Sequence, residues 1–229
     1  MKGIIISIEG TDGSGKHTQQ QLLSESLKEL GYTVFDQSFP NYQSPSSMPV
    51  KMYLNGDFGD SADSLTAYEA SALYAVDRLC TFKQTVKSHY DGGEIILFDR
   101  YVQSNFIHQC SKIEDEDERE KYLNWISDLE FNKFNLPKPD LIFFIEMPVE
   151  KSLELARARE TYKAETQKDV LEENTEYMRK SYNTGLSLAR KFDWTIIHCT
   201  NDDGSVKGIN EIHDEIMQKT NEFLEKNYK

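Results

Sequence analysis

Five short apolar segments recur along the chain, each about as long as a β-strand and apolar at neighbouring positions rather than only at alternate ones. They cover residues 3–9, 32–38, 94–99, 140–147 and 194–199. Longer segments with helical spacing separate them. In the first of these, Leu22, Leu23, Leu27 and Leu30 share one helix face, and Gly31 supplies a helix stop. Strands that alternate with helices predict an α/β fold, with a five-stranded parallel sheet covered by helices on both faces.

Polar segments complete this outline. Residues 115–120, with the sequence DEDERE, form a charge cluster that is most simply the solvated start of a helix; a docking surface is the alternative. Residues 161–168 lie between two helical patterns and predict a mobile excursion, within a lid at about 157–169. Residues 209–228 predict a closing amphipathic helix. We see no repeat and no linker, so a single domain over residues 1–229 is expected.

Composition and charge narrow the class of protein. The 229 residues are 38% hydrophobic and 28% charged, which is typical of a globular chain. The net charge of −13 argues against nucleic-acid binding, although an anionic small substrate needs only a local cluster of Arg and Lys. No apolar run approaches the ~20 residues that span a bilayer, and no signal peptide is recognisable. The three cysteines match no metal or disulfide pattern, so we expect a cytoplasmic protein with free thiols and no membrane partner.

A glycine-rich segment follows the first predicted strand and opens the first predicted helix, which is the setting of a phosphate-binding P-loop. Glycines let backbone N–H groups close around phosphate oxygens, and the helix N-terminus adds partial positive charge. Lys16 would neutralise the β- and γ-phosphates of a nucleotide. The alternative is a chance glycine-rich turn. The predicted ATP-binding residues are Gly10, Thr11, Asp12, Gly13, Ser14, Gly15, Lys16, His17 and Thr18.

One position departs from the P-loop pattern. The pattern has a Ser or Thr directly after the Lys, as a magnesium ligand, and here His17 occupies that place, with Thr18 following. Mg²⁺ prefers oxygen ligands and keeps several waters, so we expect that His17 does not hold the metal. Magnesium would then depend on phosphate oxygens, water and a carboxylate elsewhere.

Two arginine-containing motifs suggest where an acceptor would bind. The third apolar strand ends in Asp99, as in a Walker-B strand, and Arg100 follows it. A guanidinium binds phosphate oxygens bidentately, whereas a structural salt bridge is the alternative for this pair. Tyr74 and Arg78 lie one helical turn apart, a spacing that suits a stacked base whose edge is read by Arg. The alternative is a core tyrosine beside a solvated arginine.

Further residues outline an acceptor side and a lid. The segment Phe39-Pro40-Asn41-Tyr42 follows the second strand and would line the acceptor side of the cleft. Arg157 and Arg159 lie near the start of the polar excursion, where they suit a lid that closes on the transferring phosphoryl group. The alternative for the two arginines is a solvated helix face.

Taken together, these motifs resemble the thymidylate kinase family nearly from end to end. The specific pieces are IEGTDGSGK at 8–16, FP at 39–40, YAVDR at 74–78, FDRY at 98–101 and PKPDLIFFIE at 137–146. The resemblance implies a P-loop NTPase fold, a three-layer sandwich with a mobile lid. It also implies a magnesium-dependent transfer of the γ-phosphoryl group from ATP to dTMP, giving dTDP and ADP in dTTP synthesis, by a homodimer.

The resemblance also implies roles by position. Asp12 falls near the acceptor's sugar hydroxyl and the metal, and Asp99 is the second metal carboxylate. Tyr74 stands where the family usually stacks a Phe on thymine, Arg78 reads the base edge, and Arg100 binds the acceptor phosphate. The implied catalytic residues are Lys16, Asp99, Arg100, Arg157 and Arg159. The implied dTMP-binding residues are Asp12, Phe39, Pro40, Tyr74, Arg78, Arg100, Ser104, Asn105 and His108.

Two departures from the family bear on selectivity and on the lid. His108 stands where many members carry an aromatic residue near the sugar's 2′ position, which leaves discrimination against ribonucleotides open. The P-loop carries no arginine, so a lid cation is expected to supply the missing charge, from Arg157, Arg159, Lys163 or Lys168.

The predicted mechanism is phosphoryl transfer by positioning and charge stabilisation, without a general base, because the acceptor phosphate is already an anion. Three alternatives remain. The first is a kinase of the same fold acting on another nucleotide. The second is a GTPase-type switch, which the string at 132–135 (NKFN) supports poorly because it ends in Asn and precedes a strand. The third is a non-catalytic nucleotide-binding protein, which the presence of His17 suggests.

Overall fold

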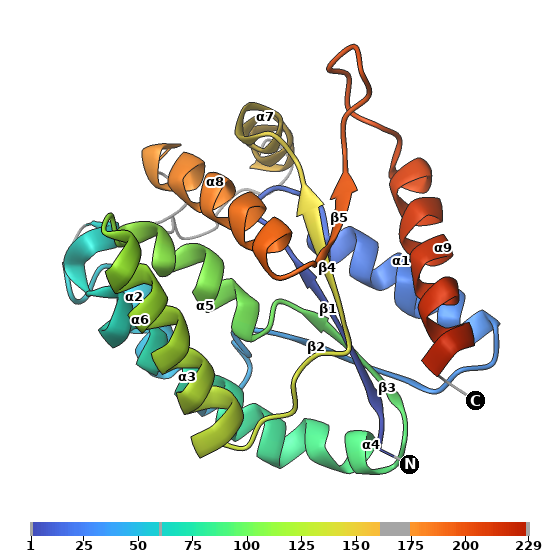
Figure 1. The fold of residues 1–229 in the computed structure, drawn as a ribbon, viewed down its shortest axis with the longest axis horizontal. Helices are drawn as coiled ribbons and strands as arrows, with labels where there is room; N and C mark the ends of the chain where they lie inside the picture. The colour runs from blue at the N-terminus through green and yellow to red at the C-terminus, as the bar shows by residue number, and fades with distance from the viewer. Residues whose placement is uncertain (1, 60, 161–174, 228–229) are drawn as a thin grey trace.

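The structure, a computed structural model, describes residues 2–59, 61–160 and 175–227, with side chains at 156–160 left out of the description. Its centre is a five-stranded parallel sheet with the order β2-β3-β1-β4-β5 (Figure 1). The strands are β1 (Ile4–Glu9), β2 (Val34–Ser38), β3 (Ile95–Asp99), β4 (Leu141–Glu146) and β5 (Thr195–His198). Each strand lies within one of the five predicted segments, which confirms the α/β fold.

Helices cover both faces of this sheet, and α1 and α9 lie together on one face, opposite α3, α5, α6 and α8 (Figure 1). The helices are α1 (Lys16–Glu29), α2 (Met48–Leu54), α3 (Ala67–Thr81), α4 (Lys87–Asp91), α5 (Val102–His108), α6 (Glu116–Ser127), α7 (Val149–Glu160), α8 (Thr175–Lys191) and α9 (Ile209–Asn227). Helices α3 and α6 each continue into a π-helical turn, Phe82–Val86 and Asp128–Lys133 respectively.

The two layers explain why the strands are apolar at every position. In β1, Ile4, Ile6 and Ile8 pack into the cluster under α1 and α9, whereas Ile5 packs into the cluster under α5 and α8. All six residues of β1 are buried, as expected for the central strand of a parallel sheet covered on both faces. The carboxyl ends of β1 and β3 meet at one edge, and the candidate site lies there.

The polar segments can be compared with their predictions where the structure describes them. The side chain of Asp115 caps α6 by accepting a 2.9 Å hydrogen bond from the Glu118 N–H, which confirms residues 115–120 as a helix start. The predicted closing helix is α9. The excursion at 161–168 lies outside the described residues, and of the lid at 157–169 only the backbone of 157–160, in α7, is described. Within the described ranges, no helix is long and apolar enough to cross a membrane.

Candidate active site

The loop between β1 and α1 depends on glycines in backbone conformations that other residues rarely adopt. Gly10, Gly13 and Gly15 have φ angles of 151°, 75° and 92°. A Cβ atom at Gly13 would lie 2.6 Å from the carbonyl oxygen of Ser152, and one at Gly10 would lie 2.9 Å from that of Ile145. The loop is therefore packed tightly against β4 and α7. Its backbone N–H groups lie at the N-terminus of α1, an arrangement that favours phosphate.

Lys16 is buried at the start of α1, where its Nζ donates a 2.7 Å hydrogen bond to the Thr11 carbonyl oxygen. Burial lowers the pKa of Lys16 to about 8; the positive charge of Arg100 acts in the same direction, and the carboxylates of Asp12 and Asp99 oppose it. A phosphate beside the ammonium group would favour its charged form. Among the described residues no carboxylate forms an ion pair with Lys16, so its ammonium group is available to an anionic ligand.

Three buried side-chain oxygens around this loop have no hydrogen-bond partner among the described residues: Thr11 Oγ1, Ser14 Oγ and Asp99 Oδ1. Buried polar atoms are normally paired, so these atoms indicate a place for a polar ligand. Oxygen is also the ligand that Mg²⁺ prefers. Within the described ranges no three His, Cys, Asp or Glu side chains converge as a metal cluster. The residues therefore fit a magnesium ion held largely by phosphate oxygens and water.

The two residues after Lys16 differ in their surroundings. The side chain of His17 is 62% exposed, and its Nδ1 lies 3.3 Å from Asp99 Oδ2. Thr18 is half-buried on the next position of α1. His17 therefore lies beside a predicted metal carboxylate but offers only nitrogen as a ligand. That it does not bind magnesium stays a prediction.

A pocket of about 110 Å³ lies next to the glycine-rich loop, and helices α2, α3 and α5 form much of its wall. Its lining residues are Asp12, Phe39, Pro40, Tyr42, Leu54, Tyr74, Arg78, Arg100, Ser104, Asn105, His108 and Gln109. All nine predicted dTMP-binding residues are in this set, although their roles stay predictions. Sequence reasoning missed Leu54 and Gln109. Gln109 directly follows His108, whereas no sequence signal pointed to Leu54 at the end of α2.

Arg100 joins the two sites. It has a left-handed backbone conformation, with φ 68°, and its Nη2 forms a short ion pair with Asp12 of the loop. Its Nη1 lies 3.3 Å from both the Gly10 carbonyl oxygen and Ser104 Oγ. Burial opposes ionisation of Asp12, but Arg100 and Lys16 outweigh it and hold the pKa of Asp12 well below its usual range. A guanidinium is thereby fixed between the P-loop and the pocket.

Glu9, at the end of β1, is a buried carboxylate that sequence reasoning missed. It accepts hydrogen bonds from the Tyr101 N–H at 2.8 Å and from Ser104 Oγ at 2.6 Å. Burial raises its pKa, and the hydrogen bond from Ser104 and the charge of Arg100 partly offset that rise. Glu9 therefore ties the start of α5, and with it the Arg100 backbone, to the central strand.

Arg78 lines the pocket from α3 and is buried, which contradicts the alternative of a solvated arginine. Its Nε and Nη2 donate hydrogen bonds of 2.6 and 3.2 Å to the two oxygens of Glu130, whose side chain is fully buried. The guanidinium also lies 5.4 Å from the Phe39 ring and 5.7 Å from the Tyr101 ring. Tyr74 lines the same pocket one turn earlier on α3.

His108 is held neutral by its contacts. Its Nε2 lies 2.9 Å from Arg100 Nη1, and because an arginine only donates, this nitrogen must be the acceptor. Burial and the charge of Arg100 together lower the pKa of His108 to about 3, against the opposing carboxylate of Asp12. The ring lies roughly parallel to that of Tyr177 on α8, with centroids 6.2 Å apart.

The predicted lid arginines, Arg157 and Arg159, belong to the last turns of α7, and their side chains lie outside the described residues. The further lid candidates, Lys163 and Lys168, lie outside them as well. Which cation approaches the loop from the lid therefore stays a prediction.

A glycine cradle, a buried lysine and an acidic strand end, placed next to a pocket with two fixed arginines, define a P-loop nucleoside monophosphate kinase. Comparison with known proteins identifies the family. The family model described as thymidylate kinase matches residues 8–216. The chain therefore belongs to the thymidylate kinase family, and the membership implies phosphorylation of dTMP to dTDP.

Relatives from bacteria and archaea agree with this assignment. The chain is 30% identical over 179 residues to a thymidylate kinase of Mycobacterium tuberculosis, an alignment that covers 78% of this chain and 82% of that protein. It is 31% identical over 219 residues to a probable thymidylate kinase of Pyrococcus horikoshii, with 95% of each chain covered. A probable thymidylate kinase of Thermococcus kodakarensis is 29% identical over 217 residues, which are 93% of this chain and 95% of that protein.

Proposed function

We propose that this enzyme transfers the γ-phosphoryl group of ATP to dTMP with donor and acceptor bound on opposite sides of Arg100. The observation that carries the proposal is the shared wall between the two sites. Asp12 belongs to the P-loop and Arg100 follows β3, and both also line the 110 Å³ pocket. An acceptor phosphate beside Arg100 would therefore face the γ-phosphate of a nucleotide on the loop, in line for transfer.

On the donor side, the backbone of residues 10–18 would bind the phosphates of ATP, and Lys16 would neutralise negative charge on the β- and γ-groups. Asp99, together with Asp12, would hold a magnesium ion, which supplies further charge neutralisation at these phosphates. A lid cation, Arg157 or Arg159, would stabilise the charge that spreads over the transferred group. The acceptor phosphate is itself an anion at neutral pH, so no residue has to remove a proton from it.

On the acceptor side, Tyr74 would stack on the base and Arg78 would donate to its O4 edge. The support for this arrangement is that Arg78 and Asn105 line the same pocket as Arg100, so a nucleotide whose phosphate binds Arg100 would have its base within this pocket. Phe39 and Pro40 would shape the pocket wall.

We further propose that the enzyme acts as a cytoplasmic homodimer in dTTP synthesis. Apolar side chains are exposed on two neighbouring helices: Met48 and Met52 on α2, at 55% and 37%, and Val76 on α3, at 45%. Such a surface suits contact with a second copy. Light scattering should then give a mass about twice that of one chain, and a monomeric mass at micromolar concentration would contradict the dimer.

The experiment that tests the function is an acceptor panel: dTMP, dUMP, UMP, CMP, AMP and GMP with ATP and Mg²⁺, with ADP formation as the readout. We expect dTMP to give the highest kcat/KM. A higher value for UMP or AMP would indicate a kinase of the same fold with another substrate. ATP turnover that does not depend on any acceptor would favour a switch-type or merely nucleotide-binding protein.

A further inference from the structure

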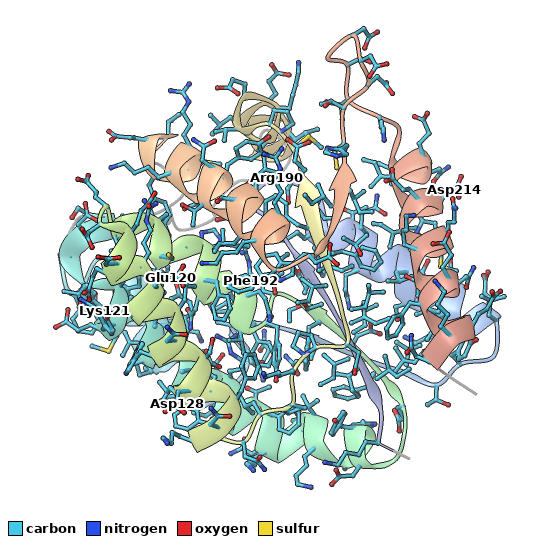
Figure 2. All side chains as sticks on the ribbon, viewed as in Figure 1. Glu120, Lys121, Asp128, Arg190, Phe192 and Asp214 are labelled. Carbon is cyan, nitrogen blue, oxygen red and sulfur yellow. The ribbon has the colours of Figure 1, made fainter. Side chains whose placement is uncertain are left out.

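Glu130 is a buried carboxylate that no step of the mechanism uses. It lies on the π-helical turn Asp128–Lys133, which continues α6. Glu120, Lys121 and Asp128 of the same segment lie on the outward side, as Figure 2 shows. The side chain of Glu130, in contrast, has no solvent exposure. It is also absent from the lining of the acceptor pocket, so it does not touch a ligand there.

The two oxygens of Glu130 are shared between two residues that do line the pocket. Arg78 donates to both oxygens through Nε and Nη2, at 2.6 and 3.2 Å. Asn105 donates to Glu130 Oε1 through Nδ2, at 3.1 Å, and the same Nδ2 lies 3.5 Å from the Ser71 carbonyl oxygen. One carboxylate therefore fixes both a guanidinium and a side-chain amide.

An ionised carboxylate only accepts hydrogen bonds, and this decides which way the Asn105 amide points. The NH₂ group must face Glu130 and the Ser71 carbonyl, so the amide oxygen Oδ1 is the atom left for the pocket. Among the described residues, Oδ1 of Asn105 and Nη1 of Arg78 have no hydrogen-bond partner. The part of the pocket that Arg78 and Asn105 line thus offers a hydrogen-bond donor from Arg78 and a hydrogen-bond acceptor from Asn105.

We propose that Glu130 is a positioning residue that sets the hydrogen-bond polarity of the base-reading end of the pocket. A donor beside an acceptor complements a pyrimidine edge with a 4-carbonyl oxygen and an N3–H, as in thymine and uracil. Cytosine presents the reverse order, a 4-amino donor and an N3 acceptor. Its donor would then face the Arg78 donor and its acceptor would face the Asn105 acceptor, which leaves these buried groups without hydrogen bonds. The proposal rests on the proposed function, because it takes this pocket as the acceptor site.

The selectivity between dUMP and dCMP isolates this polarity, because the two nucleotides differ only at positions 3 and 4 of the ring. In the unaltered enzyme we expect kcat/KM for dUMP to exceed that for dCMP at least about a hundredfold. A preference for dCMP would overturn the proposal even if dTMP is a good substrate. Failure of the proposed function is seen separately, as a purine nucleotide that outperforms both dTMP and dUMP.

Glu130→Gln tests the residue itself. A glutamine has one acceptor oxygen, which Arg78 requires, so its NH₂ would face Asn105 and turn the Asn105 oxygen away from the pocket. We expect the dUMP-to-dCMP ratio to fall at least about tenfold, the KM for dTMP to rise, and the KM for ATP to stay within about twofold. An unchanged ratio in a folded variant, or equal losses for both acceptors, would overturn the proposal.

Two further variants complete the test. Glu130→Asp keeps an acceptor-only group, so it should retain the wild-type dUMP-to-dCMP ratio within about threefold while weakening both acceptors. If Glu130→Gln does not fold, this variant decides alone, since a collapsed ratio in Glu130→Asp would overturn the proposal. Glu118→Gln on α6 makes the same chemical change at a carboxylate that pairs with Tyr68, outside the pocket, and should leave all acceptor ratios unchanged.

Discussion

The donor loop and the acceptor pocket share a wall but are constructed differently. The donor loop is a short continuous segment whose shape depends on backbone conformation, and the hydroxyl groups of Thr11 and Ser14 have no hydrogen-bond partner in the part of the chain that the structure describes. The acceptor pocket is formed by side chains from α2, α3 and α5 and from the loops that carry Asp12, Phe39 and Arg100, and its charged groups are already paired with protein partners. The polar groups of the donor loop therefore need a ligand to complete their hydrogen bonds, whereas the charged side chains of the acceptor pocket are fixed before a ligand binds.

This difference has a physical consequence. A pocket organised by buried ion pairs loses less conformational freedom when a ligand binds, which favours selectivity for shape and polarity. Its stability then depends on each pair staying complete, because removing one partner leaves a buried charge uncompensated. Substitutions in the donor loop should therefore reduce catalysis without unfolding the protein, and substitutions in the acceptor pocket should change selectivity and stability together.

The largest effect is expected at Lys16. Lys16→Ala removes a preorganised charge that acts on the transferred phosphoryl group, a contact typically worth ~3–4 kcal/mol in the transition state. We expect kcat/KM to fall by about a hundredfold to a thousandfold while the circular dichroism spectrum and melting temperature change little. Near wild-type activity in a folded Lys16→Ala protein would contradict the donor assignment.

Asp99→Asn should have the next largest effect. The substitution keeps the size of the side chain but removes the charge that would organise magnesium beside the P-loop. We expect kcat to fall about a hundredfold, and excess magnesium to recover only part of it. The measurement is a magnesium titration of kcat at saturating ATP and dTMP; a mild loss that magnesium fully restores would move the metal site elsewhere.

Arg78→Ala tests the acceptor pocket and should weaken the binding of dTMP much more than that of ATP. We expect the KM for dTMP to rise about tenfold to a hundredfold, with the KM for ATP within about twofold. Because Glu130 would be left buried and unpaired, the variant should also lose about 3–5 kcal/mol of unfolding free energy. Arg78→Lys is the matched control, since it keeps the charge and should recover stability better than dTMP affinity. Equal rises in both KM values would contradict the assignment.

The pH dependence of stability should also reflect the acceptor pocket. The pKa of His108 is about 3 in the folded protein and about 6.5 when unfolded. Below pH ~6.5 the unfolded chain therefore takes up a proton that the native state does not, and stability falls as the pH decreases toward about 3. This slope is at most about 1.4 kcal/mol per pH unit. Urea unfolding at pH 7.5 and 5 should show that the unfolding free energy falls less in His108→Gln than in the unaltered protein. An identical fall in both proteins would contradict the role of His108.

The smallest effect is expected at His17. Its side chain is mostly exposed and offers only nitrogen, so His17→Ala should change the apparent magnesium affinity by less than about threefold. His17→Ser should leave the affinity unchanged or tighten it, since a hydroxyl ligand would be restored. A large loss in His17→Ala beside a mild one in Asp99→Asn would reverse the assignment of the metal site.

Much of the donor loop could be predicted because its information is local. The glycines at 10, 13 and 15 and the lysine at 16 lie next to each other in the sequence, and the flanking strand and helix identify their setting. The strands could be predicted for a related reason. The central strand is buried on both faces, so its apolar residues are continuous and mark its limits. Part of the acceptor pocket could also be predicted from position and spacing, namely Phe39, Pro40, Tyr74, Arg78 and Arg100, whereas Ser104, Asn105 and His108 were reached only through resemblance to a family.

What the sequence by itself determined is therefore the order of the elements, the phosphate loop and the acidic end of β3. Only the tertiary structure decided the partners: Arg78 with Glu130, 52 residues apart, and Arg100 with Asp12, 88 residues apart. Glu130 stands between Leu129 and Phe131, four residues after Ile126, so its spacing fits the buried face of the helix, but no local pattern identifies its partners Arg78 and Asn105. Its burial follows from the π-helical turn and from the helices packed around it, and pairings over such separations follow from packing rather than from any pattern along the chain.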